Sequence, residues 1–257
     1  MIRIERLVKS FNGAAVLRGV DLAIQDGETV VVIGRSGGGK SVLLKHLCGL
    51  LKPDAGRVIV DDTDIVDLSE RDLAPIRRKF GVLFQGAALF DSMSVFDNIA
   101  FPLRENRQLP EEEITRQVMQ ALDIVGLTAA AKQKPGELSG GMKKRAGLAR
   151  AVVTTPKYLL YDEPTTGLDP IRADAINSLI CRLHDRYHVT SVAVTHDMVS
   201  AYKIGDRIAL LHEGRIHVIG SPREIQASDD PVVQQFIQGV ADVKHLKEVP
   251  RGEPTVH

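Results

Sequence analysis

A glycine-rich turn between a short apolar strand and a helix constrains this chain more than any other feature. Residues 30–33 read Val-Val-Val-Ile, and an apolar helix is expected over residues 42–51. The turn between them has the pattern Gly-x-x-x-x-Gly-Lys-Ser, made of Gly34, Arg35, Ser36, Gly37, Gly38, Gly39, Lys40 and Ser41. Glycines let consecutive backbone N–H groups converge on an anion, and the next helix turns its positive end toward it. We therefore expect an α/β fold built around a phosphate-binding loop.

The residue types within this loop match the chemistry of ATP. Lys40 would reach the β- and γ-phosphates, and the Ser41 hydroxyl would take a coordination position on Mg²⁺. Val42, next in the helix, completes the expected nucleotide contacts. The plain alternative is a glycine-rich turn that contains Lys-Ser by chance, and the strand before it and the helix after it argue against that.

A second feature is an apolar strand over residues 158–161 that ends in two carboxylates, Asp162 and Glu163. Ligands of open parallel sheets bind at the carboxyl ends of the strands, where the phosphate loop also lies. We expect Asp162 in the Mg²⁺ shell and Glu163 as the general base for the attacking water. Alone, such a pair would be an ordinary solvated turn.

Strands and helices alternate along the chain, which indicates an α/β fold with a mainly parallel sheet. Strands are expected at residues 2–7, 16–24, 29–33, 57–60, 80–84, 158–161, 189–194, 207–211 and 215–219. Helical periodicity at 95–104, 111–125 and 140–153 predicts a helical lobe, about residues 86–156, inserted into a domain of residues 1–240. Residues 241–257 are polar and irregular, either a frayed tail or an arm that docks on a partner.

Composition narrows the class of partner and the compartment. Lys+Arg and Asp+Glu both number 33, and this zero net charge gives no general attraction to nucleic acid, so we expect no nucleic-acid partner. Cys48 and Cys181 are expected as buried thiols of a reduced compartment. The sequence shows no signal peptide and no run near the ~20 apolar residues that span a bilayer. We expect a cytoplasmic chain whose membrane role comes through a partner.

A third motif, before the acidic strand, separates the families that share the first two. It is the segment Leu138, Ser139, Gly140, Gly141 and Met142, which resembles the signature of ABC ATPases, with Met where the commonest form has Gln. Ser139 can cap the helix that follows, and the glycines leave its amides uncovered. The resemblance implies that this helix end binds the γ-phosphate of an ATP held by a second subunit. A capped helix with no ligand is the plain alternative.

Four further positions resemble ABC elements in the order of that family. Gln85 looks like the Q-loop glutamine, which contacts Mg²⁺ or the attacking water, and residues 167–169, ending in Asp169, look like the D-loop. His196 looks like the switch histidine on the γ-phosphate, and Phe11 takes the place of the aromatic residue that stacks on adenine. Their plain alternatives are a polar turn, a capped loop, a solvated histidine and core packing.

The resemblance covers residues 2–238 and implies the ABC nucleotide-binding domain. That fold is an α/β phosphate-loop core with an antiparallel β subdomain and an inserted helical subdomain. Two copies would hold two ATP molecules between them as a homodimer. Integral-membrane permease subunits would dock beside the Q-loop, so the chain is expected on the cytoplasmic face of the inner membrane.

The cargo is indicated only by family likeness. The segment 84–98, the run Met142-Lys-Lys-Arg145 and the pair Ser41-Val42 resemble the Mla-type ATPases. Those power phospholipid transport between the inner and outer membranes, with MCE-type substrate-binding proteins and a small accessory cytoplasmic subunit. We expect Lys143, Lys144 and Arg145 to form a solvated basic face rather than a lipid contact. The alternative is that they help to hold nucleotide phosphates across the dimer.

Three alternatives differ in cargo or class. The same ATPase subunit could power a transporter of another small solute. Soluble ABC ATPases that bind nucleic acid carry a coiled-coil insertion or two cassettes, which this chain does not show. A module that binds ATP without hydrolysing it would often lack Glu163 or His196, and both are present.

Overall fold

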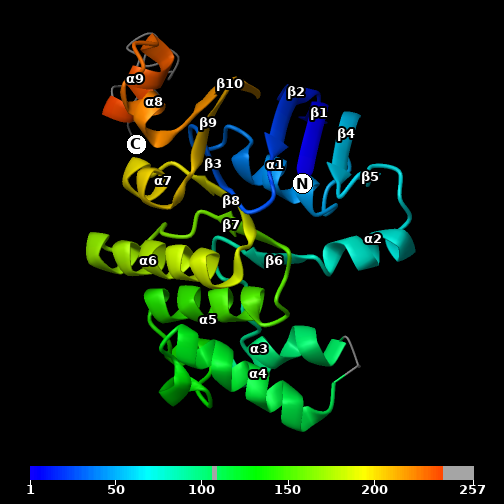
Figure 1. The fold of residues 1–257 in the computed structure, drawn as a ribbon, viewed down its shortest axis with the longest axis vertical. Coiled ribbons are helices and arrows are strands. Elements are labelled where there is room, and N and C mark those ends of the chain that lie inside the picture. The colour runs from blue at the N-terminus through cyan, green and yellow to red at the C-terminus, as the bar shows by residue number, and fades with distance from the viewer. Residues whose placement is uncertain (106–108, 240–257) are drawn as a thin grey trace, which may run out of the picture.

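The computed structural model of the protein describes residues 1–105 and 109–239, in which the strands form two sheets (Figure 1). The larger sheet has the order β10-β9-β3-β8-β7-β6. Its strands are β3 (Thr29–Ile33), β6 (Phe80–Leu83), β7 (Tyr158–Asp162), β8 (Thr190–Thr195), β9 (Arg207–His212) and β10 (Arg215–Gly220). All neighbours are parallel except β10, which pairs antiparallel with β9. This mainly parallel sheet confirms the predicted fold class.

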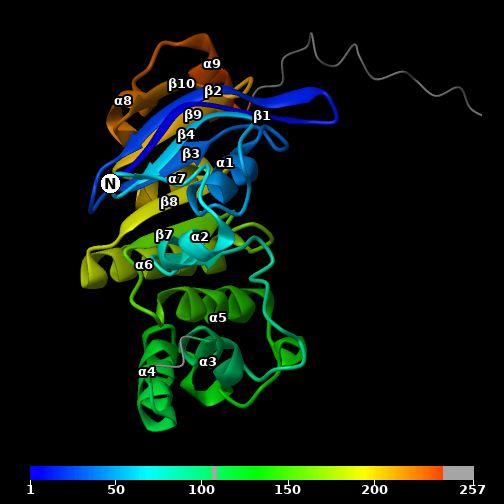
Figure 2. The ribbon, with the colours of Figure 1, turned by 90° about the vertical axis from the view of Figure 1, so that its right-hand side faces the viewer.

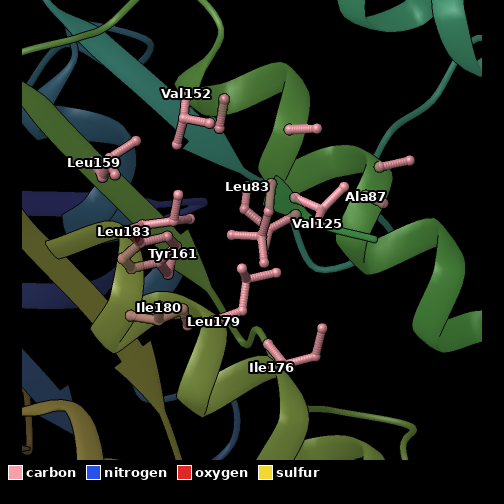
Figure 3. Packing of buried hydrophobic residues seen from close by; sticks show 14 of the residues in the cluster. Leu83, Ala87, Val125, Val152, Leu159, Tyr161, Ile176, Leu179, Ile180 and Leu183 are labelled. Atoms are coloured by element: carbon pink, nitrogen blue, oxygen red, sulfur yellow. The ribbon is translucent and has the colours of Figure 1, made fainter. Parts of the chain in front are cut away.

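The central strands are buried on both faces, as their uninterrupted apolar sequences predicted. Every residue of β3, β7 and β8 is buried. Side chains alternate between two cores, so that Val30 and Val32 pack on one side of the sheet and Val31 on the other. In Figure 3, Leu159 and Tyr161 of β7 face Leu183 of helix α6 (Pro170–Tyr187), which covers the side of the sheet that holds Val31.

The smaller sheet is antiparallel and has the order β2-β1-β4-β5. Its strands are β1 (Ile2–Phe11), β2 (Ala14–Ile24), β4 (Ala55–Val60) and β5 (Thr63–Asp64). It lies against the larger sheet in both views (Figures 1 and 2), and the Arg18 amide donates to the Gly214 carbonyl across the junction at 2.8 Å. This is the antiparallel subdomain that the resemblance implied.

The helices divide between the sheets and a separate lobe. They are α1 (Lys40–Leu47), α2 (Glu70–Arg77), α3 (Val95–Glu105), α4 (Glu111–Ile124), α5 (Gly140–Val152), α6 (Pro170–Tyr187), α7 (Met198–Ile204), α8 (Pro222–Gln226) and α9 (Pro231–Gln238), with short 3₁₀ turns at Thr128–Ala130 and Pro135–Glu137. Helices α3, α4 and α5 follow β6 in the chain and precede β7, and they lie together at the lower end of the molecule in Figures 1 and 2.

Several details differ from the expectations. Helix α1 ends at Leu47, short of the expected residue 51, because the chain turns at Gly49 with φ +66°. Helix α2 and strand β5 were not predicted, although Ser69 caps α2 by accepting from the Asp72 amide. Cys48 is buried, but Cys181 is half-buried, so the expectation of two buried thiols is wrong for Cys181.

Two expectations concern membranes and the C-terminus. None of the helices in residues 1–105 and 109–239 has both the length and the apolar character needed to cross a bilayer. The predicted polar tail, residues 241–257, lies outside the described residues.

Candidate functional site

The order of the larger sheet brings three chain segments to one edge. Strand β8 lies between β3 and β7, and all three run parallel, so their carboxyl ends share that edge. The phosphate loop follows β3, the two carboxylates end β7, and His196 follows β8. The topology therefore places motifs that are distant in sequence at one place, as the sequence predicted.

The glycine-rich loop is a tight turn with an open helix start. Gly39 precedes α1 with φ +95° and supplies no side-chain cap, so the first amides of α1 are left for a ligand. A Cβ on Gly39 would lie 2.9 Å from Val16 Cγ1, which leaves no room for another residue there. Arg35, Ser36 and Gly37 form the exposed crest of the loop.

Lys40 and Ser41 join the loop to the end of β7. The Lys40 ammonium donates to the Gly34 and Arg35 carbonyls at 2.9 and 3.1 Å, and it lies 3.5 Å from Glu163 Oε1. The Ser41 hydroxyl donates to Asp162 Oδ1 at 2.7 Å. Two residues of the loop thus face two carboxylates that lie more than a hundred residues further along the chain.

Asp162 and Glu163 both face the loop although they are adjacent. Neighbouring side chains of a strand point to opposite faces. Glu163 escapes this rule because it adopts the left-handed region, with φ 48°, directly after β7. Its amide donates to the Val194 carbonyl at 2.9 Å, which fixes the turn to β8. Such a conformation is uncommon for glutamate and costs about 1–3 kcal/mol, so neighbouring contacts must maintain it.

The Glu163 carboxylate is held on its second oxygen. His196 Nδ1 lies 2.9 Å from Glu163 Oε2, and the Thr166 hydroxyl donates to the same oxygen at 2.9 Å. Thr195 Oγ1 lies 3.5 Å away. Glu163 is buried, whereas the His196 side chain is 50% exposed and can turn toward a ligand at the edge.

Among the residues that the structure describes, Gln85 is joined to this group only through its backbone carbonyl. It follows β6, and its side chain is exposed. Its carbonyl accepts from the Lys144 ammonium at 2.5 Å, and Lys144 also donates to the Glu163 carbonyl at 2.9 Å. Lys144 is buried, so the expected solvated basic face is wrong at this residue. Arg145 is half-buried and donates to the Val125 carbonyl at the end of α4.

The signature segment lies beside the D-loop of its own chain. Ser139 caps α5 by accepting from the Met142 amide at 3.4 Å, which confirms the predicted cap. A Cβ on Gly140 would lie 3.6 Å from Leu168, the residue before Asp169. Asp169 in turn caps α6 by accepting from the Arg172 amide. These residues form a second group, separate from the contacts around Lys40 and Glu163.

The remaining expected contacts lie around the loop. Phe11 is 41% exposed at the tip of the β1–β2 hairpin, with Lys9 Nζ 5.5 Å from its ring. Gly38 donates its amide to the Arg35 carbonyl, and Val42 packs partly buried against the core beneath the loop.

Sequence reasoning missed several members of the site. Thr166 and Thr195 flank the two strand ends, and their proximity to Glu163 and His196 in sequence was a usable signal. Val16 packs against the loop from β2, a contact between different sheets that no local pattern reveals. Lys144 is buried, contrary to the expected solvated face, and its basic neighbours in the sequence do not indicate this.

The fold and these contacts define a phosphate-loop nucleotide-binding protein, and comparisons with known proteins agree. A family model described as ABC transporter matches residues 17–166. The probable ribonucleotide transport ATP-binding protein mkl of Mycobacterium tuberculosis is 45% identical over 93% of this chain, which spans 66% of that relative's length. The intermembrane phospholipid transport system ATP-binding protein MlaF of Haemophilus influenzae is 39% identical over 94% of this chain and 92% of that protein.

A solved structure of an ATP-binding cassette has the same fold as this chain. The dimeric structure of the ATP-binding cassette MJ0796 bound to ADP and Pi superposes with a TM-score of 0.81 at 32% identity, over 87% of this chain and 99% of that one. The chain belongs to the ABC transporter family. The relatives that it matches within that family are ATP-binding proteins of transport systems.

Proposed function

We propose that the chain hydrolyses ATP at the carboxyl edge of its larger sheet, with Glu163 as general base. The observation that carries the proposal is the double link between loop and strand end. Ser41 meets Asp162 at 2.7 Å, and Lys40 lies 3.5 Å from Glu163. These residues occupy the place where the amides of the loop and of α1 would receive the phosphates.

Binding of the triphosphate falls to the loop. Its amides, with Lys40, would hold the β- and γ-phosphates, so the lysine would exchange its present carbonyl partners for phosphate oxygens. The Ser41 hydroxyl and the Asp162 carboxylate are adjacent hard oxygen donors, which fits Mg²⁺ completed by phosphate oxygens and water. Bound Mg²⁺ would neutralise charge on the phosphates. Gln85 is a further candidate ligand of Mg²⁺, and Phe11 is the candidate for stacking on adenine.

Hydrolysis then needs a water placed in line with the γ-phosphorus. Glu163 would accept a proton from that water as its oxygen bonds to phosphorus and the bond to the bridging oxygen breaks, which yields ADP and inorganic phosphate. His196, in contact with Glu163 Oε2, would donate to the γ-phosphate. Lys40 would balance the charge that develops on the bridging and γ-oxygens.

A second copy would complete each site. Ser139, Gly140 and Gly141 lie with the D-loop rather than with the phosphate loop of the same chain, so their uncovered amides suit a phosphate held by a partner. Two large apolar side chains beside the D-loop and the switch histidine, Ile171 and Val199, are 83% and 71% exposed. A homodimer in which Asp169 crosses to the other subunit would cover this region.

For the cargo we propose phospholipid carried between inner and outer membranes. The support is likeness: this chain matches MlaF of Haemophilus influenzae over 92% of that protein. The relative named for ribonucleotide transport is more identical, at 45%, but extends well beyond the match. The name of that relative makes a small solute the second candidate cargo.

The permease would dock where the segment after Gln85 is presented. Phe90 is 44% exposed and packs on Phe101 of α3 at 5.0 Å between ring centroids. Asn98, fully buried, donates to the Phe90, Met93 and Ser94 carbonyls and so fixes this segment as a rigid surface. MCE-type and small accessory subunits would join through the permease and the ATPase dimer at the cytoplasmic face of the inner membrane.

The test is capture of the tagged chain from mild-detergent membranes of its host, with mass spectrometry of the retained proteins and lipids. We expect a permease, an MCE-type protein and phospholipid. Phe90→Ala should reduce permease recovery, whereas Leu109→Ala, which truncates another exposed apolar side chain of the lobe, should not. Recovery of a solute permease without lipid would disprove the cargo and leave the ATPase assignment intact.

A further inference from the structure

Lys144 lies on the face of α5 that packs against β6, in the middle of a run of basic residues. Gly147 and Ala151 share that face at helical spacing. A Cβ on Gly147 would lie 2.7 Å from Leu83, and a Cβ on Gly81 would lie 2.0 Å from the Ala151 carbonyl oxygen. The two glycines thus allow α5 to approach β6 closely. That approach carries Lys144 to the edge of the sheet, where it is 5% exposed.

At this edge the Lys144 ammonium joins two carbonyls from different segments. It donates to the Gln85 carbonyl at 2.5 Å and to the Glu163 carbonyl at 2.9 Å. Gln85 is 59 residues before it and Glu163 is 19 residues after it. One side chain of the signature helix therefore connects the segment after β6 with the residue after β7.

The burial of this cation carries a desolvation cost. Desolvation lowers the pKa of the Lys144 ammonium, and the Asp162 and Glu163 carboxylates oppose that shift. A residue used only for packing would not need a charge here. The Lys144 side chain lies where it meets the backbone of the carboxylate assigned to proton transfer.

Glu163 needs such support because of its backbone. It lies in the left-handed region with φ 48°, which persists only where neighbouring contacts fix it. The Val194 carbonyl fixes its amide, and Lys144 together with the Thr166 amide fixes its carbonyl. Among the residues that the structure describes, Lys144 is the one side chain that binds this carbonyl.

We propose that Lys144 is a positioning residue for hydrolysis, whose ammonium locks the Glu163 backbone to the Gln85 segment and so holds the carboxylate against the phosphate loop. The inference rests on the proposed role of Glu163. In this role the ammonium acts through the Gln85 and Glu163 carbonyls. A change at Lys144 should therefore affect turnover and leave nucleotide binding in place.

The experiment compares Lys144→Met, Lys144→Arg, Lys143→Met and Glu163→Gln in the full chain. Lys143 is the matched control because it is the neighbouring lysine, half-buried on the same helix. For each variant, kcat and KM for Mg-ATP, the Kd for ATP from an equilibrium titration, and the thermal midpoint are measured. We expect Lys144→Met to lower kcat by about tenfold to a hundredfold, as misplaced catalytic groups do, with KM and Kd within about threefold.

The controls separate positioning from folding. Lys144→Arg, which keeps the charge and the donors, should recover part of the loss in kcat, and Lys143→Met should match the wild type. If Lys144→Met is not folded at the assay temperature, Lys144→Gln, which keeps an N–H donor group without the charge, is measured by the same comparison below its thermal midpoint. A kcat near wild type in Lys144→Met, a loss in kcat that only follows a loss in ATP affinity, or an arginine variant no better than methionine would overturn the proposal.

The Glu163→Gln arm separates this inference from the function on which it rests. If that variant is inactive and Lys144→Met is active, only the role of Lys144 fails. If Glu163→Gln turns over at the wild-type rate, the general-base assignment fails, and the positioning role fails with it.

Discussion

The two ends of strand β7 both carry clustered charge, but they use it differently. At its start, Asp61 accepts from the Tyr158 hydroxyl at 2.5 Å, from Lys157 at 2.6 Å and from Lys79 at 2.8 Å. At its carboxyl end, Asp162 and Glu163 face Ser41 and Lys40. The strand is the same, so the contrast comes from what surrounds each end.

The starting end is arranged for stability. Its side chains are partly exposed, 23% for Asp61 and 44% for Lys157, and each charge has an opposite partner. The carboxyl end buries Lys40, Asp162, Glu163 and Lys144. Both ends hold a residue in the left-handed backbone region, Asp61 and Glu163 with φ 48° each, so the difference lies in burial. Charge is buried where a ligand would bind and is partly exposed at the opposite end. We expect changes at the two ends to separate activity from stability.

The largest effect is expected from Glu163→Gln. The amide keeps the shape and cannot accept the proton, so kcat should fall by about a hundredfold or more. ATP binding should persist because the loop and Lys40 are unchanged, and Mg-ATP should trap a dimer. Turnover is measured by phosphate release and the dimer by gel filtration. A variant that remains monomeric with Mg-ATP, or that turns over normally, would contradict the role.

The next effect is expected from Lys40→Ala. This change removes the cation of the loop together with its bonds to the Gly34 and Arg35 carbonyls. A charge-assisted hydrogen bond contributes about 1.5–3 kcal/mol, so the Kd for ATP should rise by about tenfold to a hundredfold. Lys45→Ala, at an exposed position of the same helix, is the control and should bind normally. An unchanged Kd for Lys40→Ala in an equilibrium titration would rule out the phosphate contact.

The sequence predicted the carboxyl end of β7 better than its start. The loop, the acidic pair and His196 follow from local patterns, because each motif directly follows an apolar strand and parallel strands end at one edge. Asp61 had no such signal, since its partners come from β7 and from the turn before β6. That Asp162 and Glu163 face the same way was expected because the strand ends there, but the left-handed backbone of Glu163 that achieves it has no signal in the sequence. Lys144 was misjudged because its burial depends on the close approach of α5 to β6.

Asp61→Asn should affect stability and leave activity alone. The variant keeps the size of the side chain but loses the charge that holds Lys79 and Lys157. Water can still reach both lysines, so the free energy of unfolding should fall by about 1–2 kcal/mol, with kcat unchanged. Asp67→Asn, at a side chain 91% exposed, should change unfolding by less than about 0.5 kcal/mol. Urea unfolding measures both.

The difference in unfolding free energy between the wild type and Asp61→Asn should depend on pH if the ion pairs cause it. Burial raises the pKa of Asp61, but hydrogen bonds from Lys157, Lys79 and Tyr158 outweigh it and hold the pKa well below its ordinary value. A carboxyl whose pKa is lowered by folding stabilises the protein above its unfolded pKa, about 3.9 for aspartate, and loses that contribution as the pH falls below it. The gap between wild type and Asp61→Asn should therefore narrow between neutral and acidic pH. A constant gap would exclude the ion pairs as its cause.

The smallest changes in the free energy of unfolding are expected from the two tyrosines of β7. Tyr158 and Tyr161 are both fully buried, but the Tyr158 hydroxyl donates to Asp61, whereas the Tyr161 hydroxyl has no hydrogen-bond partner among residues 1–105 and 109–239. Tyr158→Phe should lower the free energy of unfolding by about 1 kcal/mol, because Asp61 loses a donor. Tyr161→Phe removes a buried polar group that gains nothing from folding, so it should be neutral or stabilising. Opposite signs in urea unfolding would show that β7 carries its stabilising polar contacts at its start. Equal losses would mean that the Tyr161 hydroxyl is satisfied too, and the contrast between the two ends would weaken.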